Sequence, residues 1–203
     1  MEALQKLLTN ELADLYDAEQ QIIKALPKMI EQCTSTELQQ ALQEHLSVTQ
    51  KQVTRLDQIF REVGEKPTKK CKGMAGIISE GEELLKEDFE DATKDAGIIG
   101  AAQKVEHYEI ASYGTAHALA EFLGIQRAAE LLEETLDEEK EADVRLTQIA
   151  ESSINLEAAD EEEEEGNVSR SGGGNGRTRA GSTTKSKGRN QRSRTRSRAK
   201  ASR

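Results

Sequence analysis

The sequence from residue 4 to residue 30, LQKLLTNELADLYDAEQQIIKALPKMI, decides the fold of this chain. Its apolar residues return every three or four positions, which is the period of an α-helix with one buried face. This apolar stripe consists of Leu4, Leu8, Leu12, Leu15, Ile22, Ile23, Leu26, Met29 and Ile30. The spacing predicts a helix over residues 2–32. Glu19 lies in the middle of the stripe, so this helix is expected to point a carboxylate into the core.

Three further segments have the same period and are predicted to be helices, over residues 36–63, 92–123 and 126–150. The first and third connections are short, so each pair of helices is expected to form an antiparallel hairpin. Residues 64–91 form a long crossover that contains a short amphipathic segment at about 77–89. Two hairpins joined by one crossover make an all-α, ferritin-like four-helix bundle. The composition agrees, because helix formers dominate these segments and aromatic residues make up only 3%.

Each predicted helix carries at least one acid or histidine on its apolar stripe. These candidates are Glu19 in the first helix, His45 in the second, Glu106 and Glu109 in the third, and Glu139 and Asp143 in the fourth. A buried carboxylate costs several kcal/mol unless a cation compensates it, and no Lys or Arg lies on the same stripes. A pair of metal ions would supply the missing charge. Carboxylate oxygens with one nitrogen favour iron or manganese, and less exclusively zinc.

A second interpretation of the same residues stays open. In a chain with 38 Asp and Glu, one Glu on an apolar stripe is usually a boundary residue that reaches solvent. A single histidine such as His45 is more often a satisfied core residue than a ligand. The protein would then be a structural or interaction protein without a functional metal site. His107 and His117 are expected at the surface in either case.

Charge divides the chain into three segments. Residues 1–150 are predicted to form the bundle, residues 151–169 an acidic linker, and residues 170–203 a basic tail. The tail holds 12 Lys and Arg and no acid, whereas the rest of the chain holds 16 Lys and Arg against 38 Asp and Glu. Because the tail has no large apolar residue, it is predicted to be disordered. Such a tail could bind DNA or RNA without sequence specificity, which adds a nucleic-acid-associated protein as a further alternative.

The sequence carries no signal for export or for a membrane. The N-terminal segment is acidic and amphipathic, and no run of apolar residues approaches the length of a membrane span. Cys33 and Cys71 lie far apart and outside any CxxC motif, as is typical of a reducing compartment. We therefore expect a cytoplasmic protein that does not interact with membranes.

Several segments resemble the YciE/YciF family, which comprises ferritin-like bacterial proteins associated with stress responses. These segments are ELADLYDAEQQIIKALPKM, EHLSVTQKQVTRL, KKCKGMAGIISEGEEL, KVEHYEIASYGT and ETLDEEKEADVRL, and the likeness runs almost continuously through residues 1–150. The resemblance implies a ferritin-like fold related in plan to rubrerythrin, a homodimer, and a dinuclear metal site. On the matching motifs, the site falls on Glu19, His45, Glu106, Glu109, Glu139 and Asp143.

Two features of the sequence depart from the expected patterns. Family members often carry an acid just before the threonine that follows the second-helix histidine, and this chain has Val48 there. The Glu-x-x-His pattern that ferritins repeat on two helices is also absent. Whether the site is redox-active therefore stays open. In a working centre, carboxylates would bridge the two metals and His45 would bind one of them.

Overall fold

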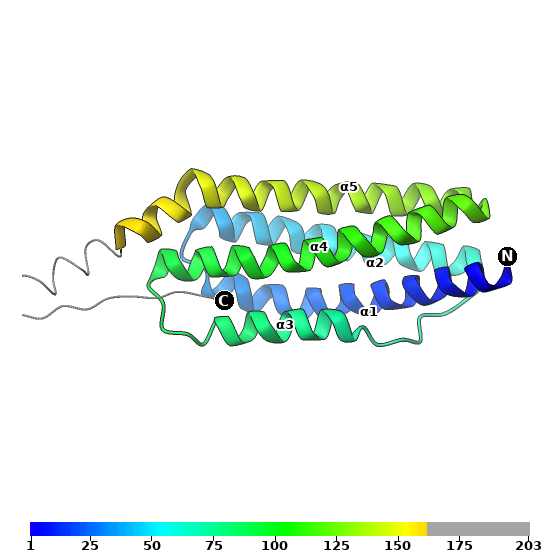
Figure 1. Cartoon of the computed structure of the whole chain (residues 1–203), viewed down its shortest axis with the longest axis horizontal. Coiled ribbons are helices and arrows are strands. Elements are labelled where there is room, and N and C mark those ends of the chain that lie inside the picture. Colours follow the sequence, from blue (N-terminus) through cyan, green and yellow to red (C-terminus); the bar gives the residue numbers. More distant parts are fainter. Residues whose placement is uncertain (162–203) are drawn as a thin grey trace, which may run out of the picture.

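The computed structural model describes residues 1–161, which form a bundle of four long helices with a short helix along one side (Figure 1). The long helices are α1 (Glu2–Gln32), α2 (Thr36–Val63), α4 (Asp91–Leu123) and α5 (Gln126–Ile149). The short helix α3 (Lys72–Leu84) lies in the connection from α2 to α4, and it begins about five residues earlier than expected. The predicted basic tail and residues 162–169 of the acidic linker lie outside the described residues.

The order of the helices in space is that of a ferritin-like bundle. Helices α1 and α2 form one antiparallel hairpin, α4 and α5 form the other, and the connection through α3 runs back along the bundle (Figure 1). Helix α1 contacts α2 and α4, and α5 contacts the same two helices, so the four helices surround one core. Helix α3 packs against α1 and α4. The predicted all-α, ferritin-like fold with one long crossover is therefore confirmed.

Local sequence signals account for where the helices begin and end. Gly64 and Gly124 end α2 and α4 with φ angles of 74° and 73°, in the left-handed region that glycine adopts without strain. Ser35 begins α2, because its side-chain oxygen accepts a hydrogen bond from the backbone N–H of Leu38. The buried carboxylate of Asp95 accepts hydrogen bonds from the backbone around this start, which fastens the α1–α2 turn to α4.

The helical backbone continues past residue 150, where the bundle was expected to end. A π-helical turn spans Ala150–Ile154, and an α-helical segment follows to residue 161. The wider turn brings Ile154 into the apolar core, five positions after Ile149. The carboxylate of Glu161 then accepts hydrogen bonds from the first backbone N–H groups of α4. The first part of the predicted linker is therefore packed against the bundle.

The apolar core consists of two clusters at opposite ends of the bundle. Both clusters draw residues from α1, α2, α4 and α5. One cluster includes Ile22, Leu42, Ile98 and Leu146, and the other includes Leu12, Leu56, Tyr113 and Leu132. On each of the four helices, polar residues occupy the positions between the two clusters. The bundle is thus apolar at both ends and polar in the middle.

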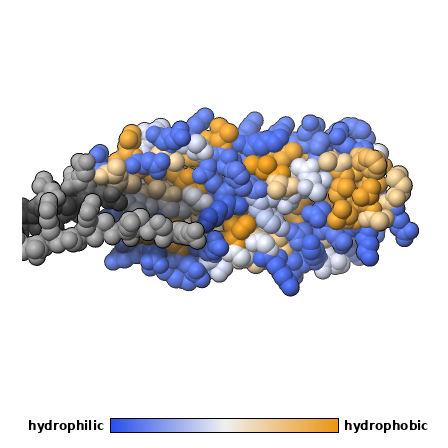
Figure 2. Space-filling view, in the orientation of Figure 1, coloured by the Kyte–Doolittle hydropathy of each residue, from blue (hydrophilic) through white to orange (hydrophobic). Residues whose placement is uncertain are grey.

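The surface is mainly polar. Hydrophilic residues cover most of the face drawn in Figure 2, and an apolar area lies at the end of the bundle that carries the N-terminus. Among residues 1–161, none of the helices combines the length and the apolar character that crossing a membrane requires.

Candidate metal centre

The polar layer in the middle of the bundle contains a compact group of carboxylates and one imidazole. One oxygen or nitrogen from each of four residues lies within 4.8 Å of the other three. These residues are His45 of α2, Glu106 and Glu109 of α4, and Glu139 of α5. His45 Nε2 lies 3.3 Å from Glu106 Oε1 and 4.0 Å from Glu139 Oε2. Glu106 and Glu109 are three positions apart, so both face the same side of α4.

Glu19 of α1 adjoins this group from the remaining helix. Its side chain is fully buried and accepts a hydrogen bond from the Tyr113 hydroxyl. The carboxylates of Glu109 and Glu139 lie close enough to affect its ionisation. The structure therefore brings together five of the six residues predicted from the sequence, with at least one from each helix of the bundle.

Asp143 is the predicted residue that the structure leaves outside the group. Its carboxylate accepts a hydrogen bond of 3.0 Å from Gln103 Nε2 and lies 3.3 Å from His107 Nε2. Four positions along a helix add a rotation of about 40° and a rise of about 6 Å, which carries Asp143 away from Glu139 toward the surface. His107 is exposed as expected, whereas His117 is half-buried.

Burial leaves several polar atoms of this layer without partners. Within residues 1–161, no hydrogen bond reaches Glu19 Oε2, His45 Nε2, Gln52 Oε1, Glu106 Oε2, Glu109 Oε1 or Glu139 Oε2. Buried polar atoms in native proteins are almost always hydrogen-bonded, and exceptions often mark a bound ion or water. The side chains of this group are at most 9% exposed. The arrangement is thus a set of metal-ligating atoms that point into one space.

Burial also determines the ionisation of the carboxyl groups. Removal from water raises the pKa of Glu19 well above its ordinary value, and the nearby Glu139 carboxylate raises it further. Burial likewise raises the pKa of Glu106, which Glu139 raises further, and burial raises the pKa of Glu109. The pKa of Tyr113 is raised by burial and by Glu19. Without a cation, these carboxyl groups favour their neutral form.

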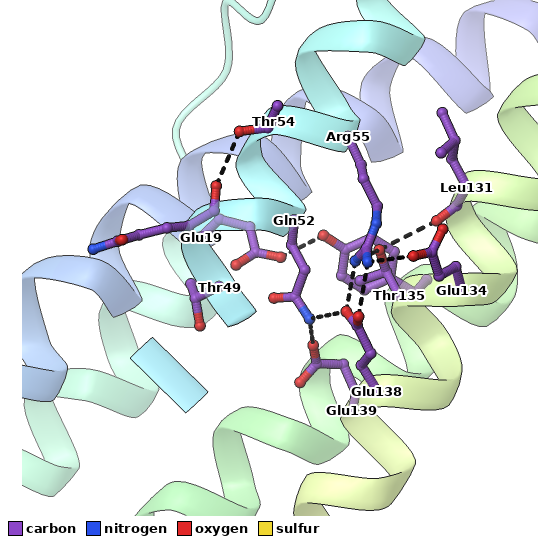
Figure 3. A network of polar contacts seen from close by, with 12 residues as sticks. Glu19, Thr49, Gln52, Thr54, Arg55, Leu131, Glu134, Thr135, Glu138 and Glu139 are labelled. Atoms are coloured by element: carbon purple, nitrogen blue, oxygen red, sulfur yellow. Dashed lines mark hydrogen bonds and ion pairs between the residues drawn. The ribbon is translucent and has the colours of Figure 1, made fainter. Parts of the chain in front are cut away.

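A glutamine in the same layer was missed by the sequence analysis. Figure 3 shows Gln52 of α2 reaching across to α5, where its Nε2 donates to Glu139 and, at 3.1 Å, to Glu138 Oε2. Arg55, one turn further along α2, lies 2.5 Å from both Glu134 and Glu138. The available signal was spacing, since Gln52 lies seven positions after His45 and therefore on the same helical face.

Two pockets reach His45 and Glu106 from different sides of the bundle. The first, which we call the α2–α5 pocket, has a volume of about 210 Å³. It is lined by Ala41, Leu42, Glu44, His45, Val48, Glu106, Glu138, Glu141, Ala142, Arg145 and Leu146. The second has a volume of about 30 Å³ and lies between α1, α3 and α4. Apart from His45, Lys28, Glu82 and Glu106, its lining is apolar.

Comparison with known proteins places the chain in a family. A family described as "Domain of unknown function (DUF892)" matches residues 3–159. The chain belongs to the DUF892 family. Protein YciF of Escherichia coli strain K12 is 42% identical to it over 160 residues, which cover 78% of this chain and 96% of YciF. The resemblance to the YciE/YciF family is therefore confirmed.

Solved structures support the same assignment. The crystal structure of the E. coli stress protein YciF matches with a TM-score of 0.73 and 42% identity, covering 76% of this chain and 99% of that one. YcfI from Rhodopseudomonas palustris matches with a TM-score of 0.69 and 48% identity, covering 71% and 92%. A two-domain protein from Anabaena variabilis with a ferritin-like domain matches at 18% identity, with a TM-score of 0.52 and coverage of 74% and 38%. This last match supports the ferritin-like fold alone.

Proposed function

We propose that this chain is a ferritin-like stress protein whose bundle core binds a pair of iron or manganese ions. The ligands in this proposal are Glu19, His45, Glu106, Glu109 and Glu139, without Asp143. The observation that carries the proposal is the set of buried oxygen and nitrogen atoms without hydrogen-bond partners on these five residues. The E. coli relative is described as a stress protein, and we extend that role to this chain.

Charge and donor chemistry support a divalent metal at this position. Four acids lie next to one imidazole, and Arg55, one turn along α2 from Gln52, is engaged by Glu134 and Glu138. Carboxylate oxygens with one imidazole nitrogen favour iron and manganese, and zinc is a weaker fit. A bound metal would favour the charged carboxylates that burial disfavours. Iron or manganese would supply one-electron redox chemistry there.

A specific observation favours a second candidate function. Glu106 lies within hydrogen-bonding reach of Glu139, and Glu109 of Glu19. Such contacts between carboxyl groups form when one member of each pair is protonated. In this alternative, the layer stays neutral, binds no metal, and the protein acts as a structural or interaction protein. A homodimer is compatible with both candidates and stays a prediction.

Metal analysis of the full chain separates the two candidates. Protein produced with iron or manganese available should retain on the order of two ions per chain, and the double substitution Glu106→Ala with Glu139→Ala should abolish this. Added metal should also raise the melting temperature of the metal-free protein, because a ligand bound only by the folded state stabilises it. A melting temperature that neither iron nor manganese changes would favour the structural alternative.

A further inference from the structure

The α2–α5 pocket connects the surface of the bundle to the proposed metal ligands. His45 and Glu106 line the pocket, and both carry a buried atom without a hydrogen-bond partner in residues 1–161. Val48 and Ala142 are short side chains in the same lining. The pocket therefore extends to two of the residues that carry these buried atoms.

Acidic side chains surround the outer part of this pocket. Glu44 of α2 and Glu138 and Glu141 of α5 all line it. Glu138 is held by Arg55, whereas Glu141 is exposed and makes no ion pair or hydrogen bond within the described part of the chain. Carboxylates around a cleft concentrate cations there and speed their association.

A second ion pair between α2 and α5, besides those of Arg55, lies at this pocket. Arg145 of α5 donates a hydrogen bond to Glu44 of α2, and both side chains line the pocket. Their side chains are 43% and 51% exposed, so this contact lies at the surface. The guanidinium places one positive charge among the three carboxylates and neutralises one of them.

The second pocket is a poor route for a cation. It offers about 30 Å³, and α3 and the apolar side chains Ile77, Ile78 and Val105 contribute to its lining. Moving an ion through an apolar environment costs far more than moving it past carboxylates.

We propose that divalent cations reach the metal centre through the α2–α5 pocket, and that the Glu44–Arg145 ion pair restrains their passage. This inference rests on the proposed metal-binding function and adds the path that the ion takes. Glu141 is the first carboxylate to attract the ion, and the His45 and Glu106 side chains receive it at the inner end. Removing the Arg145 charge speeds uptake, and removing the Glu141 charge slows it.

The test measures the rate of metal uptake by the full chain. Metal-free protein is mixed with Co²⁺ in a stopped-flow instrument, and the visible absorption of bound cobalt is followed. Arg145→Gln should raise the association rate by about threefold or more, and Glu141→Gln should lower it by a similar factor. Both variants should reach the same final absorption as the unmodified chain. The rate differences between the variants should be large at about 0.01 M salt and mostly absent at about 1 M salt, because the screening length shortens from roughly 30 Å to 3 Å.

Two matched controls lie on the same helix, away from the pocket. Arg127 and Glu130 form an exposed ion pair near the start of α5, so Arg127→Gln and Glu130→Gln change the net charge equally without touching the pocket. These controls should leave the rate unchanged. Ala142→Leu, which narrows the pocket without changing charge, should slow uptake.

The outcomes separate the two proposals. If Arg145→Gln and Glu141→Gln bind cobalt fully and at the same rates as the Arg127→Gln and Glu130→Gln controls, the uptake path is contradicted and the metal centre stands. Absence of any cobalt signal in the unmodified chain would contradict the metal centre itself, and the uptake path with it. Faster uptake by Arg145→Gln together with slower uptake by Glu141→Gln and Ala142→Leu supports both.

Discussion

Gln52 donates a hydrogen bond to Glu139 across the bundle, so one side-chain amide of α2 holds a buried carboxylate of α5 in place. The same nitrogen donates to Glu138 Oε2 at 3.1 Å, which Arg55 also contacts (Figure 3). Residues that orient a metal ligand commonly matter nearly as much as the ligand itself. Gln52 therefore connects the surface ion pairs of α5 to the proposed metal centre.

This contact predicts a loss of metal affinity when Gln52 is shortened. Gln52→Ala removes the donor from Glu139 and should weaken metal binding by about 10- to 100-fold, the usual cost of losing a residue that orients a ligand. Gln50→Ala is the matched control, because Gln50 is exposed on the opposite face of α2. Competition against a chelator measures both affinities. Equal affinities for the two variants would remove Gln52 from the site.

The second prediction concerns how the stability of the metal-free protein depends on pH. Burial raises the pKa of Glu19, Glu106 and Glu109 above the ordinary value of 4.5. The folded chain therefore binds more protons than the unfolded chain once the pH exceeds that value. The stabilisation from these groups is complete at pH values below 4.5, and it is lost as the pH rises through the pKa values of the folded state.

Thermal unfolding of the metal-free protein between about pH 5 and about pH 8 tests this sign. Relative to the triple variant Glu19→Gln, Glu106→Gln and Glu109→Gln, the unmodified chain should lose stability as the pH rises. Metal should oppose that loss, because its binding releases protons and strengthens with pH. Parallel curves for the two metal-free proteins would show that these carboxyl groups do not carry raised pKa values.

The structure also explains which parts of the site the sequence could predict. Glu19, Glu106 and Glu139 interrupt apolar stripes, and that local pattern is enough to place them in the core. Gln52 has no such signal beyond its spacing from His45, because its role depends on which residue of α5 lies opposite. The apolar stripe of a helix is also wider than the part of the helix that faces the centre of the bundle. The sequence pattern therefore could not distinguish an acid at the centre from the acid one turn away.

The end of the bundle was missed for a related physical reason. The apolar period stops at residue 150 because the π-helical turn Ala150–Ile154 inserts an irregular step. Ile154 then returns to the core five positions after Ile149, a spacing that an α-helical pattern does not contain. The four helices and their crossover were predictable because their stripes are regular and long.

The third prediction concerns the charge at Glu19. Glu19→Gln removes a buried acid but keeps an oxygen for the Tyr113 hydroxyl, which donates to Glu19. The metal-free variant should therefore be as stable as the unmodified chain or more so, while metal binding falls. Glu19→Leu should be less stable than Glu19→Gln, because a buried tyrosine hydroxyl without a partner costs about 1 to 3 kcal/mol.

Calorimetry of the metal-free variants measures this effect, with metal content determined on the same samples. Glu133→Gln is the control, since Glu133 is exposed on α5 and should alter neither quantity. A metal content in Glu19→Gln equal to that of Glu133→Gln would remove Glu19 from the ligand set.

The last prediction concerns the basic tail, residues 170–203, which lies outside the described residues and is argued from composition alone. Its 12 positive charges and absence of acids suit phosphate groups of DNA or RNA. It has no aromatic residue to stack on bases, so it should prefer neither a sequence nor single strands. The acidic run that precedes it could compete for the same arginines.

Gel-shift titrations at two salt concentrations test this prediction. The full chain should bind nucleic acid weakly at low salt, and truncation after Ser169 should abolish binding, because the remaining chain holds 16 Lys and Arg against 38 Asp and Glu. Replacing residues 162–165 by Gly and Ser should raise the affinity by removing four competing carboxylates. Glu161 is kept in that variant because it accepts hydrogen bonds from the start of α4. If the truncated chain binds as well as the full one, the tail is not the binding element and the nucleic-acid interpretation fails.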